Sequence, residues 1–481
     1  MASCMLALGF LMKLLFAASV SASSYLRLQH KYTELAGSSK HGPMTSSHFE
    51  HVHSHDVLRQ RRHLLGATAF PLGGSADPTT AGLYFTELQI GTPAASYFAQ
   101  VDTGSDVLWL GCASCRNCPT KSNLGVKLRP YDPSDSETSS ELSCTASLCT
   151  TRCVAGNPCL YQLAYGDGST SEGYLVQDVL ELPSLKNLTV SADSANLVFG
   201  CAVSASGGLQ KRDQALDGIL GLGQSNLSLV LQLANQKKTP QTFAHCLEGE
   251  GKGGGILVIG EVNESGLSYT PLRSNQLHYN VNLKSIQVNG QPIQWDQSSS
   301  TSGEITGTIF DSGTTLAYIP EASYLDLLQQ VFPTQSIQHL SDLDLDCFVY
   351  HGSVDDEFPT VIFTFESGAT LRVYPRDYFI QLEYGKDTLY CMGFQISPSG
   401  SPHLIILGDM ILKDKLVVYD LENQRIGWVD FNCSSHVTVM TSTGPPTEVF
   451  STTIGSAHVD HFPALRLTTA LSMLFFLLLI V

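Results

Sequence analysis

The chain carries the same short phrase twice, and this repetition constrains its fold more than any other feature. Phe98-Ala-Gln-Val-Asp102-Thr-Gly-Ser and Gly307-Thr-Ile-Phe-Asp311-Ser-Gly-Thr each lead from an apolar segment into an aspartate, a hydroxyl residue, a glycine and a second hydroxyl residue. A carboxylate at the end of a buried strand is costly unless the fold supplies hydrogen bonds or a use for it. Two such carboxylates predict a paired site to which both halves of the chain contribute.

A second repeat supports this pairing. Asp217-Gly-Ile-Leu-Gly221 follows the first aspartate, and Ile405-Ile-Leu-Gly408-Asp follows the second. A glycine after apolar residues lets the backbone come close to another strand, where a side chain would collide. The pattern indicates an internal duplication in which each of two lobes contributes one aspartate.

Together these motifs resemble those of the pepsin-like aspartic proteases over roughly residues 82–433. Tyr165-Gly-Asp-Gly-Ser169 resembles the flap of that family, and Trp109 resembles the residue that hydrogen-bonds the flap tyrosine. Tyr165, Gly166, Asp167 and Trp109 are therefore expected at the substrate cleft. The many cysteines early in the first half make the chain most similar to the atypical, nepenthesin-like plant branch. The resemblance implies an all-β, bilobal pepsin-like fold with a few short helices.

The resemblance also implies the chemistry. Asp102 and Asp311 are expected to be catalytic and to share one proton, because two carboxylates close together do not both ionise readily. The ionised member would activate a water and the protonated member would polarise the scissile carbonyl, without metal or cofactor. The expected activity is hydrolysis of internal peptide bonds at acidic pH. Supporting roles are expected for Thr103, Gly104, Ser105, Ser312, Gly313 and Thr314, with Ser105 and Thr314 donating hydroxyl hydrogen bonds to the carboxylates.

Other interpretations of these motifs stay open at this point. Each aspartate could simply bond its own turn, as Asp before Gly often does. The chain could also be a catalytically silent binding or inhibitor protein of the same fold, like the xylanase-inhibitor members, or a paired-carboxylate glycosidase. The intact motifs and flap favour the protease. For Asp167 the alternatives are a carboxylate that shifts substrate preference or pH optimum and a solvated hairpin tip.

Composition agrees with a large β protein. The 481 residues suffice for two lobes with their own cores. Short alternating or β-branched segments predict strands at 84–90, 195–199, 255–259, 279–288 and 361–365, and helical spacing predicts helices at 228–235 and 321–331. The net charge of -17 makes nucleic acid an unsuitable partner.

The cysteines predict disulfides. Of the 13 cysteines, Cys4 falls in a leader, and the even remainder in an exported chain indicates disulfide pairing. Cys112, Cys115 and Cys118 have zinc-like spacing, but the oxidising secretory route favours disulfides there too. The other candidates in the first lobe are Cys144, Cys149, Cys153, Cys159 and Cys201. The family pattern implies that Cys347 pairs with Cys391 and Cys246 with Cys433.

The ends of the chain predict secretion and membrane anchoring. Residues 1–22 have the pattern of a signal peptide. Small residues around Ser456, a polar spacer and an uncharged tail at 467–481 fit a glycosylphosphatidylinositol (GPI) anchor signal, with Ser456 as the attachment site and a tail-anchored helix as the alternative. The predicted organisation is a signal peptide (1–22), a propeptide and linker (23–78), an N-terminal lobe with a cysteine-rich insertion and the flap (82–265), a C-terminal lobe (266–433), a Ser/Thr/Pro-rich stalk (434–456) and an anchor signal removed on maturation (457–481).

These features place the mature protein at the extracellular face of the plasma membrane, as a monomer acting on protein or peptide substrates. N-glycosylation is predicted at Asn187, Asn226, Asn263 and Asn432, the last being doubtful because its sequon contains Cys433. The propeptide is rich in histidine: His30, His41, His48, His51, His53, His55 and His63. One hypothesis is that acidification charges them and loosens the propeptide. The alternatives are a disordered linker with incidental histidines and a histidine-rich metal site.

Overall fold

The computed structural model describes residues 66–450 apart from 80, 152, 155, 184, 186–189, 250–252, 295–306, 333–337, 341–344, 385–386 and 442–445. The chain divides into two compact units, 1–62 and 63–481, and every described residue belongs to the second. The predicted signal peptide, most of the predicted propeptide, Asn187 and the predicted anchor signal lie outside the described residues. Within the described part, no helix is long and apolar enough to span a bilayer.

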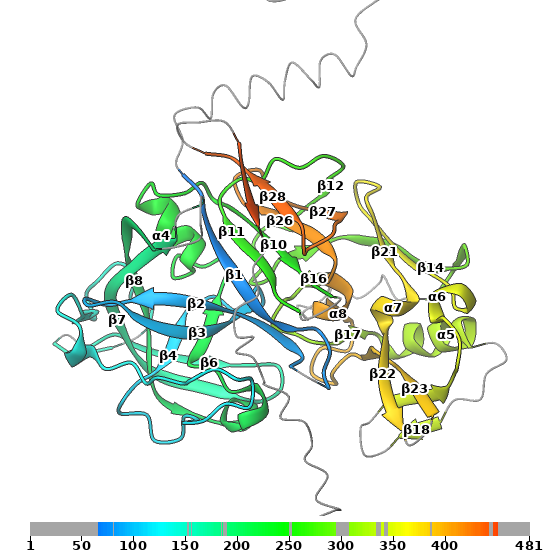
Figure 1. Cartoon of the computed structure of the whole chain (residues 1–481), viewed down its shortest axis with the longest axis horizontal. Coiled ribbons are helices and arrows are strands. Elements are labelled where there is room, and N and C mark those ends of the chain that lie inside the picture. Colours follow the sequence, from blue (N-terminus) through cyan, green and yellow to red (C-terminus); the bar gives the residue numbers. More distant parts are fainter. Residues whose placement is uncertain are drawn as a thin grey trace, which may run out of the picture. The chain divides into compact units, whose positions relative to one another are not determined.

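Strands dominate the described residues, which confirms the all-β expectation (Figure 1). The largest sheet contains β1 (Thr68–Ser75), β2 (Leu83–Ile90), β3 (Ala95–Asp102), β4 (Trp109–Gly111), β5 (Ser140–Glu141), β6 (Leu160–Ala164), β7 (Thr170–Pro183), β8 (Val190–Ala205), β9 (Gly218–Gly221), β10 (Thr242–Leu247), β11 (Gly255–Ile259), β12 (Ser268–Pro271), β26 (Lys415–Asp420) and β27 (Arg425–Asp430). These 14 strands follow the order β12-β27-β26-β10-β11-β1-β2-β3-β9-β4-β8-β7-β5, with β6 paired to β7.

Smaller sheets make up the rest of the second half. The first is β13-β16-β25-β17-β24, formed by β13 (Asn280–Val281), β16 (Gly307–Phe310), β25 (Leu404–Leu407), β17 (Ala317–Ile319) and β24 (Phe394–Ile396). The second is β15-β14-β20-β21, formed by β15 (Gln291–Pro292), β14 (Leu283–Val288), β20 (Val361–Phe365) and β21 (Thr370–Val373). The others are β18-β19-β23-β22, with β18 (Gln338–Leu340), β19 (Leu345–Val349), β23 (Asp387–Met392) and β22 (Phe379–Tyr384), and the hairpin of β28 (His436–Val439) and β29 (Thr447–Phe450).

Short helices connect the strands. They are α4 (Leu229–Asn235), α5 (Glu321–Val331), α6 (Val354–Glu357), α7 (Pro375–Tyr378), α8 (Asp409–Leu412) and the 3-10 turns η2 (Pro133–Asp135), η3 (Gly207–Gln210) and η4 (Arg212–Gln214). Helices α4 and α5 were predicted from apolar spacing. Ser228 caps α4 by accepting the Leu231 N–H at 3.4 Å, and α5 buries Tyr324, Leu327 and Val331 on one face.

The duplication is visible as a repeated three-strand unit. Strand β3 runs parallel to β9, which is antiparallel to β4; likewise β16 runs parallel to β25, which is antiparallel to β17. The registers place Asp102 opposite Gly221 and Phe310 opposite Leu407. Each aspartate motif therefore lies directly beside its own glycine repeat. This agrees with the internal duplication that the repeats in the sequence indicated.

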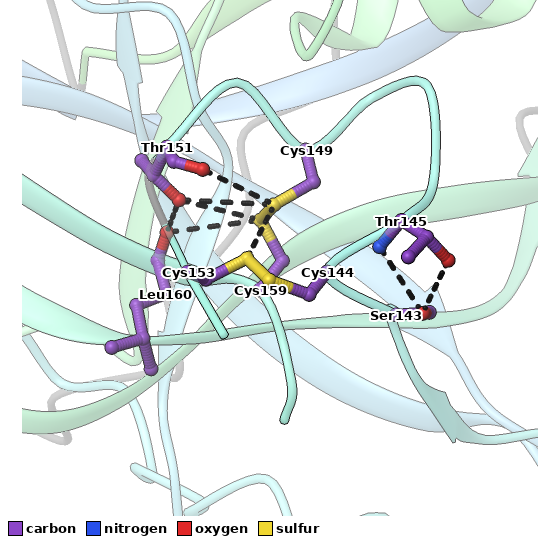
Figure 2. Close-up of a disulfide and its surroundings, with 8 residues drawn as sticks. All are labelled: Ser143, Cys144, Thr145, Cys149, Thr151, Cys153, Cys159 and Leu160. Atoms are coloured by element: carbon purple, nitrogen blue, oxygen red, sulfur yellow. Dashed lines mark hydrogen bonds between the residues drawn. A yellow bond between two sulfur atoms is a disulfide. The ribbon is translucent and has the colours of Figure 1, made fainter. Parts of the chain in front are cut away.

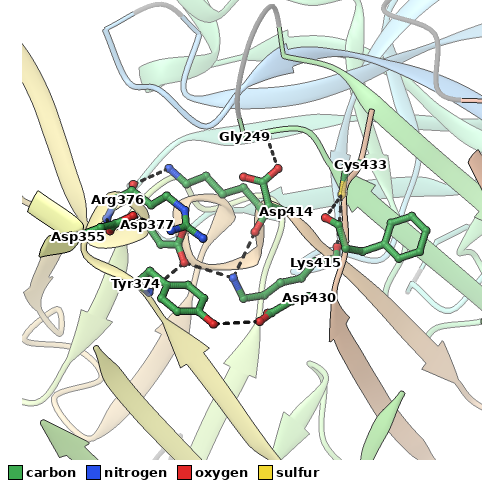
Figure 3. A network of polar contacts seen from close by, with 11 residues as sticks. Gly249, Asp355, Tyr374, Arg376, Asp377, Asp414, Lys415, Asp430 and Cys433 are labelled. Carbon is green, nitrogen blue, oxygen red and sulfur yellow. Dashed lines mark hydrogen bonds and ion pairs between the residues drawn. The ribbon is translucent and has the colours of Figure 1, made fainter. Parts of the chain in front are cut away.

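The two halves nevertheless share one sheet. Strand β26, from the C-terminal half, pairs with β10, and β27 joins β26 to β12 (Figure 1). A polar network lies beside this junction (Figure 3). The Lys415 ammonium lies 3.4 Å from an Asp377 oxygen, and both side chains are only 2% exposed. The same Asp377 oxygen accepts the Tyr374 N–H at 3.0 Å, so the pair ties α7 to the shared sheet.

Two segments at the edges of the predicted lobes form strands. Residues 68–75, within the predicted propeptide and linker, form β1 and pair with both β11 and β2. Phe70 and Leu72 of this strand are buried, and its glycines fit because a Cβ on Gly74 would lie 2.1 Å from the Leu83 carbonyl oxygen. The glycines and proline that suggested a linker instead allow close strand approach.

The predicted stalk is also partly folded. Residues 436–439 and 447–450 form the hairpin β28–β29. Val437, Val439 and Val449 are buried in a cluster that includes Cys433. Alternation of valine and threonine gives this segment one apolar face, which packs against the body.

Candidate active site

The fold brings the two predicted catalytic aspartates face to face. Asp102 ends β3, and Asp311 follows β16. A Cβ added to Gly104 would lie 2.4 Å from the Asp311 Oδ1, and one added to Gly313 would lie 2.1 Å from the Asp102 Oδ1. Each motif's glycine thus packs against the other motif's carboxylate, and no larger residue fits there without moving an aspartate.

Each carboxylate is held by matching hydrogen bonds. The Gly104 N–H donates to Asp102 Oδ1 at 2.8 Å and the Ser105 hydroxyl donates to Oδ2 at 2.5 Å. In the second motif, the Gly313 N–H donates to Asp311 Oδ1 at 2.9 Å and the Thr314 hydroxyl donates to Oδ2 at 2.7 Å. The Ser105 and Thr314 hydroxyls therefore lie where the sequence predicted. These bonds fix both carboxylates in one orientation.

Thr103 and Ser312 cross-link the two motifs. The Ser312 N–H donates to the Thr103 hydroxyl at 2.9 Å, and the Thr103 N–H donates to the Ser312 hydroxyl at 3.2 Å. In turn, the Thr103 hydroxyl donates to the Phe310 carbonyl at 3.1 Å and the Ser312 hydroxyl to the Val101 carbonyl at 3.0 Å. The sequence placed both residues at the site, but this crossing arrangement depends on contacts between distant segments.

Burial and repulsion set the protonation of the pair. Asp102 is 5% exposed. Burial first, and the Asp311 carboxylate second, raise the pKa of Asp102 well above its usual value, against the lowering effect of the Ser105 and Gly104 hydrogen bonds. Because the carboxylates interact strongly, the proton belongs to the pair rather than to one residue. The pair can therefore hold one proton over a wide acidic range.

The predicted flap is a hairpin turn between β6 and β7. The Trp109 Nε1–H donates to the Tyr165 hydroxyl at 2.7 Å, as the resemblance implied. Gly168 adopts a positive φ of 82°, and a Cβ on Gly166 would meet open space. Asp167 is exposed and its oxygens accept the Ser169 N–H at 2.9 Å and the Ser169 hydroxyl at 2.6 Å. Asp167 thus closes the turn, which favours the interpretation as a solvated hairpin tip.

A cavity of about 190 Å³ lies beside the flap partner Trp109. Its apolar lining includes Trp109, Leu128, Leu216 and Ile219. Gln100 also lines it and donates to the Gly313 carbonyl at 3.4 Å, so the cavity adjoins the second aspartate motif. Polar residues, among them Arg129 and Asp217, also line it, so the pocket is partly polar.

Asp217 and Asp409, the acidic residues of the two glycine repeats, were not assigned to the site from the sequence. Asp217 lines the cavity, accepts the Phe98 N–H at 2.8 Å and the Arg129 N–H at 2.6 Å, and burial raises its pKa to about 6. Asp409 is 1% exposed, and neither of its carboxyl oxygens is hydrogen-bonded to another described residue.

Asp409 lies directly behind the second catalytic turn. Its N–H donates to the Thr314 carbonyl at 2.7 Å. Burial, then the Asp311 and Asp102 charges, raise the pKa of Asp409 well above its usual value. The glycine repeats were noted in the sequence, but the burial of the acid that follows Gly408 appears only in the folded chain.

The twelve predicted cysteines form six disulfides. They are Cys112–Cys201, Cys115–Cys118, Cys144–Cys153, Cys149–Cys159, Cys246–Cys433 and Cys347–Cys391. The last two are the pairs that the family pattern implied. The sulfurs of Cys144, Cys149 and Cys153 lie within 4.8 Å of one another (Figure 2), but each is bonded to another sulfur and offers no thiolate to a metal. Cys159 immediately precedes β6, so its bridge anchors the strand that leads to the flap.

The predicted glycosylation sites differ in their surroundings. Asn226, Asn263 and Asn432 are exposed. The side-chain oxygen of Asn432 accepts the Ser434 N–H at 3.0 Å, and Cys433 between them is in a disulfide. This local structure counts against glycosylation of Asn432.

The chain is similar to known proteins over most of its length. The family described as Xylanase inhibitor N-terminal matches residues 84–261, and Xylanase inhibitor C-terminal matches residues 278–430. The chain is 40% identical to Aspartic proteinase 36 of Arabidopsis thaliana over 435 residues, which cover 88% of this chain and 87% of that protein. It is 38% identical to Aspartic proteinase 39 of the same plant over 461 residues, covering 94% and 92%.

Solved structures support the fold alone. Basic 7S globulin from soybean is similar with a TM-score of 0.58 and 21% identity, and covers 76% of this chain and 95% of its own. Conglutin gamma, a basic 7S globulin from lupine seeds, is similar with a TM-score of 0.59 and 20% identity over the same shares.

Proposed function

The chain belongs to the pepsin-like aspartic proteinases of plants, and on this premise we propose that it hydrolyses internal peptide bonds at acidic pH through a water activated between Asp102 and Asp311. One observation carries the proposal. Both aspartate motifs are complete, and each packs its glycine against the other's carboxylate. Two carboxylates in such contact can share a proton, which supplies a base and an acid at the same site.

The residues around the pair define the steps. The ionised carboxylate takes a proton from the water as the water attacks the peptide carbonyl. The protonated carboxyl donates to the carbonyl oxygen and stabilises the tetrahedral oxyanion. Ser105 and Thr314 hold the carboxylates in position throughout. Tyr165, bonded to Trp109, closes over the substrate and excludes water from the reacting bond.

The cavity beside Trp109 favours substrates with bulky apolar residues next to the cleaved bond. Leu128, Leu216 and Ile219 supply apolar lining for such a side chain. The polar lining includes Gln100, Arg129 and Asp217. An extended peptide would lie across the site and pair partly through its backbone.

The experiment compares three secreted forms of residues 23–455: the parent, Asp102→Asn and Asp311→Asn. Cleavage of a quenched apolar peptide is followed from pH 3 to pH 7, with and without pepstatin. We expect pepstatin-sensitive cleavage by the parent alone. Absence of cleavage after verified removal of the propeptide would contradict the proposal.

A second candidate is a catalytically silent binding or inhibitor protein with this fold. The description of the two matching families as xylanase inhibitors favours it. The two candidates differ in the same assay, because an inhibitor would be inactive with both aspartates intact. In that event, binding of the parent to a xylanase would be measured next.

We further propose that the protein is exported, is anchored by GPI at Ser456 on the extracellular face of the plasma membrane, and belongs to the atypical, nepenthesin-like branch. The leader, the small residues around Ser456 and the uncharged tail support this location. Treatment of membranes with phosphatidylinositol-specific phospholipase C is expected to release the protein. Retention in the membrane pellet would contradict the anchor.

A further inference from the structure

Strand β1 limits where an N-terminal segment can be removed from this chain. It lies inside the largest sheet, paired with β11 on one side and with β2 on the other (Figure 1). Its Ala69, Phe70 and Leu72 are buried, and Ala67, just before the strand, packs against the apolar cluster that contains Ala69. Loss of β1 would leave both neighbouring strands with unpaired backbone groups and expose apolar side chains to water. A mature chain with this fold therefore begins before Ala67.

The sequence holds three pairs of adjacent basic residues. They are Arg61–Arg62, Lys211–Arg212 and Lys237–Lys238. The first pair lies outside the described residues, and Arg59 adds a third positive charge two positions before it. An endoprotease whose specificity pocket holds an acidic side chain recognises basic residues of this kind. Of the three pairs, Arg61–Arg62 is the one that precedes β1.

The other two pairs are held in folded turns. Lys211 lies between η3 and η4, and its N–H donates to the Gly208 carbonyl at 2.9 Å. The last pair follows α4, where the Lys237 N–H donates to the Ala234 carbonyl at 2.9 Å and Lys237 has a φ of 58°. A peptide that pairs with a protease through its backbone is extended, so cleavage at either pair would require these turns to open.

Strand β1 also keeps Arg62 away from the catalytic aspartates of the same chain. The registers of β1 with β2 and of β2 with β3 place Asp102 level with Ser75, the last residue of β1. Thr68 begins this 8-residue strand, about 23 Å from that level. Residues 63–67 extend over at most about 18 Å. While β1 stays paired, the bond after Arg62 therefore cannot enter the chain's own active site.

We propose that a separate endoprotease, specific for paired basic residues, matures this chain by hydrolysing the bond between Arg62 and His63. Water adds across this bond, which leaves a carboxyl group on Arg62 and an amine on His63. The product keeps all of β1 and begins five residues before it. This maturation does not depend on the peptidase activity proposed above, because the chain is here the substrate of another enzyme.

Self-cleavage would leave a different product. The proposed peptidase favours apolar residues beside the cleaved bond, and the apolar pair nearest to the basic motif is Leu64–Leu65. Self-cleavage would therefore produce a terminus at or after Leu65. It would also require the catalytic aspartates, whether of the same copy or of a second copy. The two routes thus differ in the N-terminus and in the response to loss of one aspartate.

The test compares four full-length chains made in eukaryotic cells: the parent, Asp102→Asn, Arg62→Gln and Arg212→Gln. The last is the matched control, because it removes an exposed arginine from a basic pair within the fold. N-terminal sequencing of the purified proteins identifies the terminus. The parent, Asp102→Asn and Arg212→Gln are expected to begin at His63. The fraction of chains with this terminus is expected to fall at least about tenfold in Arg62→Gln.

Two results would overturn the proposal. One is a terminus at His63 in the parent but not in Asp102→Asn, because processing would then need the chain's own catalytic pair. The other is a parent that keeps its N-terminal segment or begins at a residue other than His63. If the parent fails to cleave peptides, the protease proposal fails, while the termini of the parent and of Asp102→Asn still decide how the chain is matured.

Digestion of the mature protein by a kexin-type endoprotease tests the selection among the three pairs. Cleavage at Lys211–Arg212 and at Lys237–Lys238 is expected to be at least about tenfold slower in the folded protein than in synthetic peptides of the same sequences. Equal rates in protein and peptides would mean that the turns give no protection. Arg62 would then have no preference over the other pairs, and the proposal would be overturned.

Discussion

Replacement of Asp409 by asparagine tests the electrostatics behind the active site. The change keeps the size of a side chain that is 1% exposed and removes its ability to ionise. Burial, together with Asp311 and Asp102, raises the pKa of Asp409, so the native state keeps a proton that the unfolded chain releases above about pH 4. Rising pH therefore favours the unfolded state, and the contribution of Asp409 to stability falls as pH rises.

The magnitude follows from linkage. Each pH unit over which the native acid stays protonated and the unfolded acid is ionised costs about 1.4 kcal/mol of unfolding free energy. Over two such pH units the unfolding free energy of the parent falls by about 2.7 kcal/mol through this residue. The Asp409→Asn variant does not undergo this fall. The unfolding free energy of the variant, relative to that of the parent, is expected to rise steadily as the pH is raised from 4 to 6.

The assay is urea unfolding at pH 4, 5 and 6, followed by tryptophan fluorescence, with the exposed Asp356→Asn as a control for loss of one carboxylate. Asp102 and Asp217 are present in all three proteins, so the difference between the curves isolates Asp409. Parallel curves for the parent and Asp409→Asn would refute the reasoning, because they would mean that Asp409 is ionised in the native protein or exposed to water.

Three further substitutions test contacts of the shared sheet and the site. Lys415→Met leaves Asp377 buried without its cation and is expected to lower the unfolding free energy by about 3–5 kcal/mol, whereas Lys415→Met with Asp377→Leu recovers most of it in urea titration. Trp109→Phe removes the donor to the Tyr165 hydroxyl and is expected to reduce kcat/KM about tenfold, with unfolding unchanged within about 1 kcal/mol. Gly313→Ala places a Cβ 2.1 Å from the Asp102 Oδ1 and is expected to lower kcat at least about a hundredfold in the peptide assay; near-parental rates would show that the turn tolerates a side chain.

The sequence predicted those parts of the site that depend on short local motifs. The Asp102 and Asp311 turns and the Trp109 partner of Tyr165 each depend on a few neighbouring residues, and the structure places all of them together. The sequence did not predict Asp409 because its burial appears only in the folded chain, where its N–H donates to the Thr314 carbonyl of a distant segment.

The same reason explains why the sequence did not predict the strands at 68–75 and 436–450. Residues 68–75 contain proline and paired glycines, which signal a linker locally, and become a strand because β2 and β11 flank them. Residues 436–450 have the composition of a stalk, but their valines meet an apolar face that the sequence alone does not reveal. Local composition describes a segment's preferences, and its neighbours in space decide between strand and linker.

The shared sheet also dictates an order of events during synthesis. Strand β10 has a permanent partner in β26, some 170 residues later in the chain. Until that strand has been synthesised, β10 presents an open edge that can pair with other chains. Cys246 of β10 likewise cannot form its disulfide until Cys433, which lies 187 residues downstream, has been synthesised. A chaperone or oxidoreductase that covers β10 would protect the nascent protein through this interval, and the yield of folded protein is expected to depend on it more than the stability of the finished protein does.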